Sequence, residues 1–490
     1  MKVRISKQIV IAALVHFVLV LLYLIDSVID KNTLLQNTQF VSIISVVLLA
    51  YIYISWNKLY YRFFSPYIVI VSTLYLTLCG QGLAWAFGLK AGYRDLRYAT
   101  YKTLSFSEPD LCKAMLFSLL CISILHLTVI YSINKKTGYT FARKNLFMNN
   151  DRSDLKEREQ YKAMILVGAF FILLGIIPYI SSNLTSYALI KAGGYGNQYE
   201  SISFGIDSIS AKMADFYVVG ALTYLFIWGK KNALNKNNFL FKAGLAYFFI
   251  AVHLCIQLLL GQRTGLILFC VALLFIFYNN KRISYKKSIL GIVSAFMLFG
   301  GLRAVDLFRS GQIQGIEDFF EYFLIDSPVF DFLGDIGWNL MSTLEFQKII
   351  PEVADFGYGF SYLISMTSVV PNLNFWDVHP AYLYGNISGW LQNYLGFSFG
   401  IGCTPVAEAY YNFGFLGWLI FIIWGMFVVK LNRSFENNES LLDSYQTVLF
   451  MGILLKAAVR SSFFAVFRPY LLEIILPVLM IKFLSSRFMK

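Results

Sequence analysis

Five arginines lie at turns between apolar runs, where a guanidinium group could bind phosphate. Planar guanidinium groups match phosphate oxygens through two parallel hydrogen bonds. A single arginine at such a turn more often extends to lipid headgroups or caps a helix end. Five arginines on three turns favour a bound polyanion instead. They are Arg263, Arg303, Arg309, Arg460 and Arg468.

The first of them lies between two glycines in the stretch LLLGQRTGLILF. Gly261 and Gly265 allow close approach of the backbone to a ligand. The helix that follows would add amide donors and the positive end of its dipole. We therefore expect a phosphate-binding turn around Arg263. The sequence has no P-loop, no GxGxxG motif and no Asp-x-Asp metal motif, so we expect no cofactor and no metal, and a lipid-borne phosphate is favoured over a nucleotide.

Three residues could accept a proton beside such a phosphate. Asp377 and His379 lie in WDVHP, and Glu408 lies at the start of an apolar helix in AEAYYNFG. An acid inside a membrane is a functional candidate by default, and histidine titrates near neutral pH. A structural role remains open for each of the three. Nearby aromatic side chains could stack on a sugar or anchor the chain at the membrane interface, namely Trp376, Tyr382, Tyr384, Trp390 and Tyr394.

The elements that must hold these residues are membrane-spanning helices. The 490 residues are 58% hydrophobic and only 14% charged, against about 25% charged residues in soluble domains. Repeated apolar runs match the length of about 20 residues that crosses a bilayer. We predict an all-α integral membrane protein with about twelve spans. The expected spans lie near residues 9–28, 38–56, 66–88, 110–132, 163–181, 210–228, 240–259, 265–280, 287–302, 407–429, 445–463 and 469–485.

The distribution of lysine and arginine predicts the orientation of these spans. With the N-terminus inside, most of the 41 Lys and Arg residues fall in cytoplasmic loops, as the positive-inside rule requires. Both termini are then cytoplasmic, and the five arginines lie near the outer face. We divide the chain into nine spans over 1–302, a large outer loop over 303–406 and three spans over 407–490. Short helices on or dipping into the outer membrane surface are expected in that loop.

Several other classes of protein are disfavoured by the same residues. The net charge of +13 comes from short clusters between apolar runs, which does not indicate binding of nucleic acid. The six cysteines lie mostly inside apolar runs and form no CxxC pair, so we interpret them as small apolar side chains. Asp326, Asp331 and Asp335 could share a helical face, but solvated acids are more common than a metal site there.

Several stretches of the C-terminal half together resemble one family. They are GQRTGLILF, LRAVDLFRS, the long outer loop, GIGCTPVAEAYYNFGFLGW and RSSFFAVFRPYLLEIILP, within residues 255–480. The most specific piece runs from Glu408 through Tyr411 and Asn412 to Gly414, with Gly417 three residues later. This pattern resembles the Wzy-type O-antigen or oligosaccharide repeat-unit polymerases. The N-terminal half agrees in hydropathy alone.

The resemblance implies a multi-span, glycosyltransferase C-like bundle in the cytoplasmic (inner) membrane of a bacterium. A growing glycan would pass from undecaprenyl pyrophosphate to another lipid-linked repeat unit on the outer face, for lipopolysaccharide or capsule biosynthesis. The arginines would stabilise the departing pyrophosphate, while Glu408, His379 or Asp377 would accept the proton of the attacking hydroxyl. The implied partners are the lipid-linked donor and acceptor, membrane lipids, a chain-length regulator and a flippase.

Three alternatives use similar residues. An O-antigen-ligase-like transferase would need much the same lipid-phosphate site, and only its acceptor would differ. A flippase or transporter of the lipid-linked oligosaccharide should show two related halves with broken helices, and we find no internal repeat. A structural scaffold would not need the arginines. The sequence therefore favours a polymerase.

Overall fold

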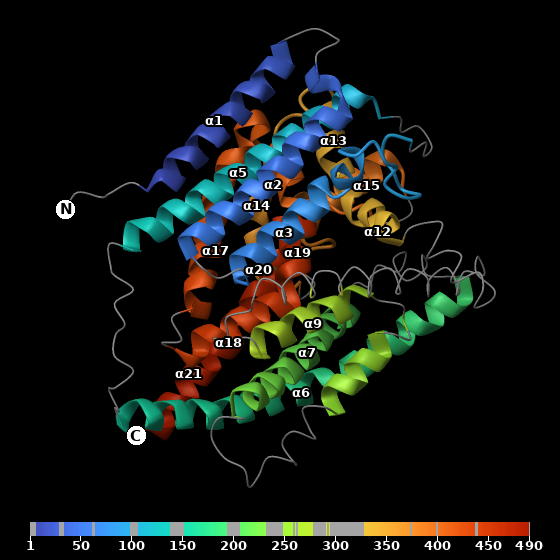
Figure 1. The fold of residues 1–490 in the computed structure, drawn as a ribbon. Helices are drawn as coiled ribbons and strands as arrows, with labels where there is room; N and C mark the ends of the chain where they lie inside the picture. Colours follow the sequence, from blue (N-terminus) through green and yellow to red (C-terminus); the bar gives the residue numbers. More distant parts are fainter. Residues whose placement is uncertain are drawn as a thin grey trace, which may run out of the picture. The chain divides into compact units, whose positions relative to one another are not determined.

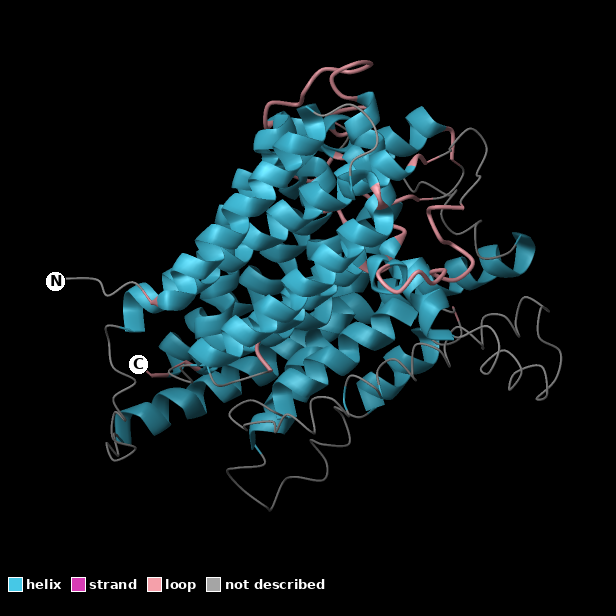
Figure 2. Ribbon diagram, turned by 45° about the horizontal axis from the view of Figure 1, so that its top comes forward, coloured by secondary structure: helices cyan, strands magenta, loops and turns pink. Residues whose placement is uncertain are grey.

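The computed structural model describes most of the chain (Figure 1). The described residues are 6–28, 34–60, 64–98, 106–137, 151–193, 206–231, 248–257, 260, 263–277, 291, 294, 328–372, 375–397, 400–436 and 440–489. Within these ranges the chain is helical and contains no strand (Figure 2). The expectation of an all-α membrane protein is thereby confirmed at the level of helix content.

Seven helices of the described residues are long and apolar enough to cross a membrane. They span Lys7–Val28, Thr38–Tyr60, Glu108–Asn134, Leu155–Lys191, Pro405–Phe435, Leu441–Arg460 and Phe463–Phe488. The predicted number of about twelve is not confirmed. Three predicted spans contain shorter helices, α3 (Pro66–Cys79), Phe248–Gln257 and α9 (Arg263–Phe277), while α7 (Ile206–Lys231) covers 210–228. The span predicted over 287–302 lies almost wholly outside the described residues.

Packing divides the chain into two compact units. Unit 1 comprises residues 1–142, 282–359 and 402–432, and unit 2 comprises residues 143–281, 360–401 and 433–490. This division groups residues by contact and not by their position in a membrane. The expected division into spans and outer loop at residues 302 and 406 therefore stays a prediction.

Unit 1 is built around α5 (Glu108–Thr137), which is packed by α1 (Lys7–Val28) and α2 (Thr38–Tyr60). The most apolar window of α5 is 89% buried, as expected for a helix that is hydrophobic on every side. His126 of α5 is 1% exposed, and its ring nitrogens bond to Ser55 and Tyr67. The helices α13 (Leu340–Ile349) and α16 (Pro405–Phe413) complete this unit from the C-terminal half.

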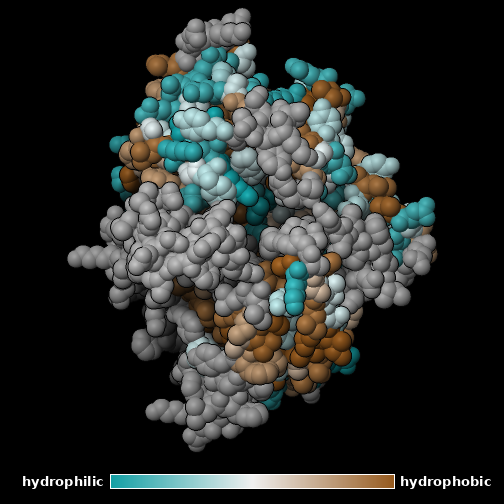
Figure 3. Space-filling model, turned by 90° about the vertical axis from the view of Figure 1, so that its right-hand side faces the viewer, coloured by the Kyte–Doolittle hydropathy of each residue, from teal (hydrophilic) through white to brown (hydrophobic). Residues whose placement is uncertain are grey.

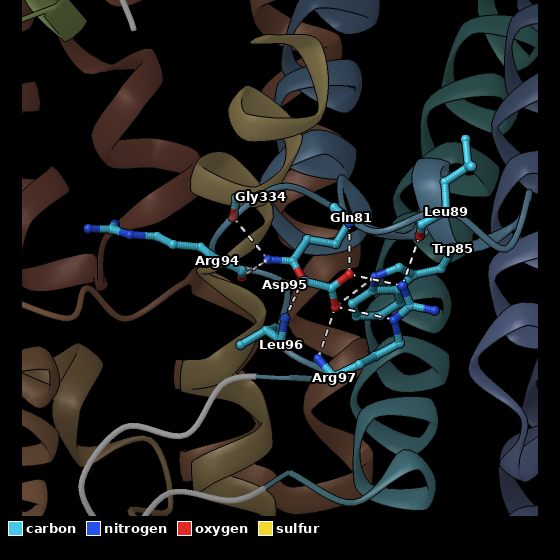
Figure 4. Close-up of polar contacts among 9 residues, drawn as sticks. Gln81, Trp85, Leu89, Arg94, Asp95, Leu96, Arg97 and Gly334 are labelled. Atoms are coloured by element: carbon cyan, nitrogen blue, oxygen red, sulfur yellow. Dashed lines mark hydrogen bonds and ion pairs between the residues drawn. The ribbon is translucent and has the colours of Figure 1, made fainter. Parts of the chain in front are cut away.

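A polar network in unit 1 fixes the segment between α4 (Gly82–Trp85) and α5 (Figure 4). Asp95 is 1% exposed and accepts hydrogen bonds from the Trp85 indole and from the Arg97 guanidinium, whose Nη2 lies 2.9 Å from Oδ2. The amide of Gln81 donates to the carbonyl oxygens of Arg94 (2.8 Å) and Gly334 (2.9 Å). Since the Asp95 carboxylate is paired and hydrogen-bonded, this buried ion pair has a structural role.

Unit 2 is dominated by α6 (Asp151–Gly193) and α7, which pack along one another. Around them lie α9, α18 (Leu441–Leu449), α19 (Leu455–Arg460), α20 (Phe463–Pro469) and α21 (Leu476–Phe488). Large apolar side chains of α6 are exposed, including Leu173 and Ile177 at 74% and 76%. The space-filling view shows a hydrophobic area on one face of the molecule (Figure 3). An outward apolar surface on a long helix is expected where lipid is the solvent.

The described part of the predicted outer loop consists of short helices, as the sequence led us to expect. In unit 1 these are α12 (Pro328–Gly337) and α13. In unit 2 they are α14 (Phe360–Met366), η3 (Thr367–Val369), the π-helical turn η4 (Ala381–Gly385) and α15 (Ile387–Leu395). Asn386 caps α15 at its N-terminus by accepting from the amide of Gly389.

Candidate functional site

The motif that carries the family resemblance begins with α16 in unit 1. Thr404 caps this helix, because its Oγ1 accepts from the amide of Ala407 at 3.1 Å, and Pro405 occupies the first helical position. The helix ends at Gly414, whose φ of 55° is unfavourable for other residues. A Cβ there would also lie 2.8 Å from the Phe356 ring. Local residue chemistry thus defines both ends of α16.

Asn412 and Tyr411 bind the turn over residues 357–359. The Asn412 Oδ1 accepts from the amide of Gly359 at 2.9 Å. The backbone carbonyls of Tyr411 and Asn412 accept from the amides of Gly357 and Tyr358, each at 3.0 Å. These contacts indicate that the pattern YNFG closes α16 onto a neighbouring turn. Support of the chemistry by Tyr411, Asn412 and Gly414 stays a prediction.

Glu408 lies in the first turn of α16 and is only 1% exposed. A carboxylate in that position is favoured by the positive end of the helix dipole. Burial raises the pKa of the Cys403 thiol, and the charge of Glu408 raises it further. The side chain of Glu408 is therefore buried.

Glu345 of α13 is a second buried acid in unit 1. The effect of its ionised carboxylate on the stability of the fold can be measured. It is 4% exposed, and its Oε1 has no hydrogen-bond partner among the described residues. Burial raises the pKa of Glu345, Lys348 lowers it and Asp110 raises it. A carboxyl with a raised pKa in the folded state favours folding when protonated, and this contribution is lost as the pH rises.

We therefore expect Glu345→Gln to raise the melting temperature at pH 8 and to change it less at pH 5. The measurement is thermal unfolding of the purified protein in detergent at both pH values. Glu352→Gln is the matched control, since Glu352 is exposed. A lower melting temperature for Glu345→Gln at pH 8 would contradict the expectation.

In unit 2, charged residues from three elements meet around Arg468, near the end of α20. Asp215 of α7 and Glu473 of η7 (Tyr470–Ile475) are close enough for their charges to act on the Arg468 guanidinium. Lys212 Nζ lies 4.0 Å from Asp215 Oδ2. Glu473 is 5% exposed, whereas the side chain of Asp215 is 46% exposed. The Arg468 Nε is buried without a hydrogen-bond partner in the described part of the chain.

Arg263 and Arg460 lie at one common end of unit 2. A methyl group on Gly452 would lie 3.0 Å from the Cβ of Ala272 in α9. Arg263 is nine residues before Ala272, and Arg460 is eight after Gly452, so each lies about 12 to 14 Å from this contact along its helix. Phe275, near the C-terminal end of α9, contacts the ring of Phe435, which lies six residues before α18 begins. The two helices are therefore antiparallel.

The same end of unit 2 contains Asp215. A methyl group on Gly229, near the end of α7, would lie 2.1 Å from Ile276, near the end of α9. Asp215 precedes Gly229 by fourteen residues, and Arg263 precedes Ile276 by thirteen. Asp215 and Arg263 therefore each lie about 20 Å from the Gly229–Ile276 contact, toward the N-terminal ends of their helices. Asp215 in turn interacts with Arg468. Backbone position thus brings Arg263 and Arg460 to one end of unit 2, and Arg468 belongs to the same end through its interaction with Asp215.

His379 lies in the same unit but uses both ring nitrogens for local structure. Its Nδ1 accepts from the amide of Ala381 at 3.0 Å, so its Nε2 carries the proton and donates to the carbonyl oxygen of Val370 at 3.1 Å. Burial and the Arg468 charge lower the pKa of His379 from 6.5, while the bond to Val370 raises it. Neutral His379 therefore holds the start of η4. Asp377, two residues earlier, is exposed.

The remaining predicted site residues are only partly described. Gly261, Arg303 and Arg309 lie outside the described residues, and for Arg263 and Gly265 only the backbone is described. Asp215 and Glu473 were not singled out by sequence reasoning. The signal that selects Glu408, an acid in an apolar helix, is also present at both positions, in MADFYVV and YLLEIILP. No group of three His, Cys, Asp or Glu in the described ranges could hold a metal ion.

Comparison with known proteins extends the resemblance over the whole chain. No curated protein and no solved structure matches the chain significantly. The model of one family, described as O-antigen polysaccharide polymerase Wzy, matches residues 8–490. This range includes the N-terminal half, for which the sequence patterns gave hydropathy alone. The chain therefore belongs to the O-antigen polysaccharide polymerase Wzy family.

Proposed function

We propose that this protein is a glycosyltransferase that polymerises lipid-linked repeat units on the outer face of a bacterial cytoplasmic membrane. The donor is a growing glycan on undecaprenyl pyrophosphate, and the acceptor is the terminal sugar of a second lipid-linked unit. Family membership supports the class of reaction. The observation that carries the proposal is the gathering of Arg263, Arg460 and Arg468 at one end of unit 2, at the ends of membrane helices.

The reaction breaks one bond and forms one bond. The bond between the anomeric carbon of the donor and the pyrophosphate oxygen breaks, and the electron pair leaves with undecaprenyl pyrophosphate. The acceptor hydroxyl oxygen forms the new glycosidic bond and loses its proton to a base. Guanidinium groups placed in advance around the pyrophosphate would stabilise the charge that develops on it. Arg468 is the best-described candidate for this role, and Arg263, Arg303, Arg309 and Arg460 are the others.

We assign the base to Asp377 in preference to Glu408 and His379. A base must come within hydrogen-bond distance of the hydroxyl whose proton it accepts. Asp377 is exposed and belongs to unit 2, as Arg468 does. Glu408 is 1% exposed, and both ring nitrogens of His379 are bonded to the backbone. Asp377 is thus the acid that an acceptor sugar can reach without rearrangement of the fold.

The membrane context completes the proposal. Both termini lie in the cytoplasm, as the distribution of lysine and arginine indicates. Lipid-linked units reach the outer face through a flippase, and a chain-length regulator limits the polymer. Neither of these two partners is needed for the bond-forming step itself.

The test is polymerisation by the purified protein in liposomes that contain only phospholipid and lipid-linked repeat units. We expect a ladder of products with two or more repeats and release of undecaprenyl pyrophosphate. Transfer onto a lipid A core alone, without a ladder, would identify a ligase. Movement of single repeats across the bilayer with no new glycosidic bond would identify a flippase, and either outcome would overturn the proposal.

A further inference from the structure

The short helix α14 in unit 2 has its polar residues inside and its apolar residues outside. Ser361 and Ser365 are 1% and 0% exposed, and the Ser365 hydroxyl donates to the carbonyl oxygen of Ser361 at 2.6 Å. Phe360, Leu363 and Met366 are 52%, 65% and 45% exposed. A helix at a surface in contact with water shows the opposite arrangement. The outer side of α14 therefore faces an apolar environment.

The turn η4 extends this surface. Leu383 and Tyr384 are 51% and 59% exposed, and the ring centroid of Tyr384 lies 6.0 Å from that of Phe360. Gly385 allows the turn to pack closely on α14, because a Cβ there would lie 2.6 Å from the Ser365 hydroxyl. We call this surface the α14 apolar face, and it consists of Phe360, Leu363, Met366, Leu383 and Tyr384.

The α14 apolar face lies beside the helix that carries Arg468. Tyr362 of α14 packs on Phe463 of α20, with ring centroids 5.6 Å apart, and Tyr382 of η4 packs on Phe464 at 6.3 Å. Arg468 follows Phe463 by five residues, about 7.5 Å along the helix. An extended apolar surface and an arginine whose buried Nε has no hydrogen-bond partner among the described residues therefore lie near one another within unit 2. A molecule with a long apolar chain and a phosphate at one end has the same two parts.

We propose that the α14 apolar face binds the polyprenyl chain of the lipid-linked donor while Arg468 binds its pyrophosphate. The identity of the donor rests on the proposed function. Ordinary acyl chains of the bilayer are the competing occupant. The polyprenyl chain is favoured because Arg468 lies on the helix that packs on α14, and its Nε has no hydrogen-bond partner among the described residues, so it can bind the charged end of the same molecule.

The first experiment identifies what contacts the face. A photo-crosslinking amino acid replaces Leu363 in the full-length protein, in liposomes that contain phospholipid and labelled undecaprenyl pyrophosphate. A matched protein carries the crosslinker at Leu173, which is 74% exposed on α6. We expect labelling at Leu363 to exceed labelling at Leu173 by about tenfold, which corresponds to about 1.4 kcal/mol of preferential binding. Excess unlabelled carrier should remove this difference.

Equal labelling at the two positions would show that the α14 apolar face contacts bilayer lipid without preference, and would overturn the inference. Polymerisation in the same liposomes separates this result from a failure of the proposed function. If polymer forms while labelling is equal, only the inference about the face fails. If the carrier labels Leu363 specifically but no polymer forms, the lipid site stands and the polymerase activity fails.

The second experiment uses the length of the lipid. Leu363→Gln should raise the KM for undecaprenyl-linked repeat units about tenfold with little change in kcat, because it weakens a contact made equally in the ground and transition states. With a donor carrying only two isoprene units, the same variant should match the wild type. Leu173→Gln is the control. A KM change that is the same for long and short donors would show that Leu363 does not contact the chain.

Discussion

Replacing Arg468 with alanine is expected to slow glycosyl transfer by about 10- to 1,000-fold while the protein remains inserted in the membrane. A hydrogen bond to a charged group contributes about 1.5 to 3 kcal/mol, and a factor of ten in rate corresponds to about 1.4 kcal/mol. Losing one hydrogen bond to the departing pyrophosphate therefore gives at least about tenfold, and losing part of a second bond brings the effect to about 1,000-fold. The measurement is the rate of polymer formation from lipid-linked repeat units in liposomes.

Two further variants separate this role from a structural one. Arg468→Lys keeps the charge next to Asp215 and Glu473, so folding should be preserved, but it loses the planar fork and should recover only part of the rate. Arg487→Ala removes an arginine at the opposite end of the Phe463–Phe488 helix and should remain within about twofold of the wild type. If Arg468→Ala transfers at the wild-type rate, the phosphate must be bound elsewhere. Arg263 and Arg460 are then the next candidates.

Asp377→Asn is expected to lower kcat by about 100- to 10,000-fold, the range in which a general base contributes. The amide keeps the shape of the side chain and removes its ability to accept a proton. Because Asp377 is exposed, its replacement should leave the melting temperature within about 1 °C of the wild type. The single-turnover rate of glycan transfer with saturating donor measures the effect on chemistry.

Glu408→Gln is the comparison that decides between the two carboxylates. Glu408 is enclosed in unit 1 at the start of α16, so we expect the amide to change stability and to leave the transfer rate within about threefold. If instead Glu408→Gln abolishes transfer and Asp377→Asn does not, Glu408 is the base. In that case the region around α16 must open to admit the acceptor.

The class of fold could be predicted from the sequence, because long apolar runs leave few alternatives to membrane helices. The number of spans could not. The run over 66–88 is as apolar as its neighbours, yet α3 ends at Cys79. There the chain turns, and the Gln81 amide bonds to backbone carbonyls at Arg94 and Gly334. Such a partner far along the sequence leaves no trace in local hydropathy.

The candidate site shows a similar limit. The sequence identified arginines near the outer face, where the positive-inside rule disfavours basic residues. It did not identify the acidic residues beside them, because Asp215 and Arg468 are far apart in the sequence. Residue type also gives a wrong functional prediction where the side chain is hydrogen-bonded to the backbone. His379 fits a catalytic pattern in WDVHP, but its ring nitrogens are hydrogen-bonded to the Val370 carbonyl and the Ala381 amide. Asn412 fits a site motif, but its amide oxygen accepts from Gly359. Only coordinates reveal such local partners.

The contact between Gln81 and Gly334 sets an order of events during biosynthesis. The two residues are 253 positions apart, and ribosomes add about 5 to 20 residues per second. For roughly 10 to 50 seconds after Gln81 is made, its amide lacks this partner. The early helices of unit 1 must therefore remain incompletely packed in the membrane until α12 has been synthesised. Unit 1 is consequently finished late in translation, and its first helices depend on insertion machinery or lipid for protection in the meantime.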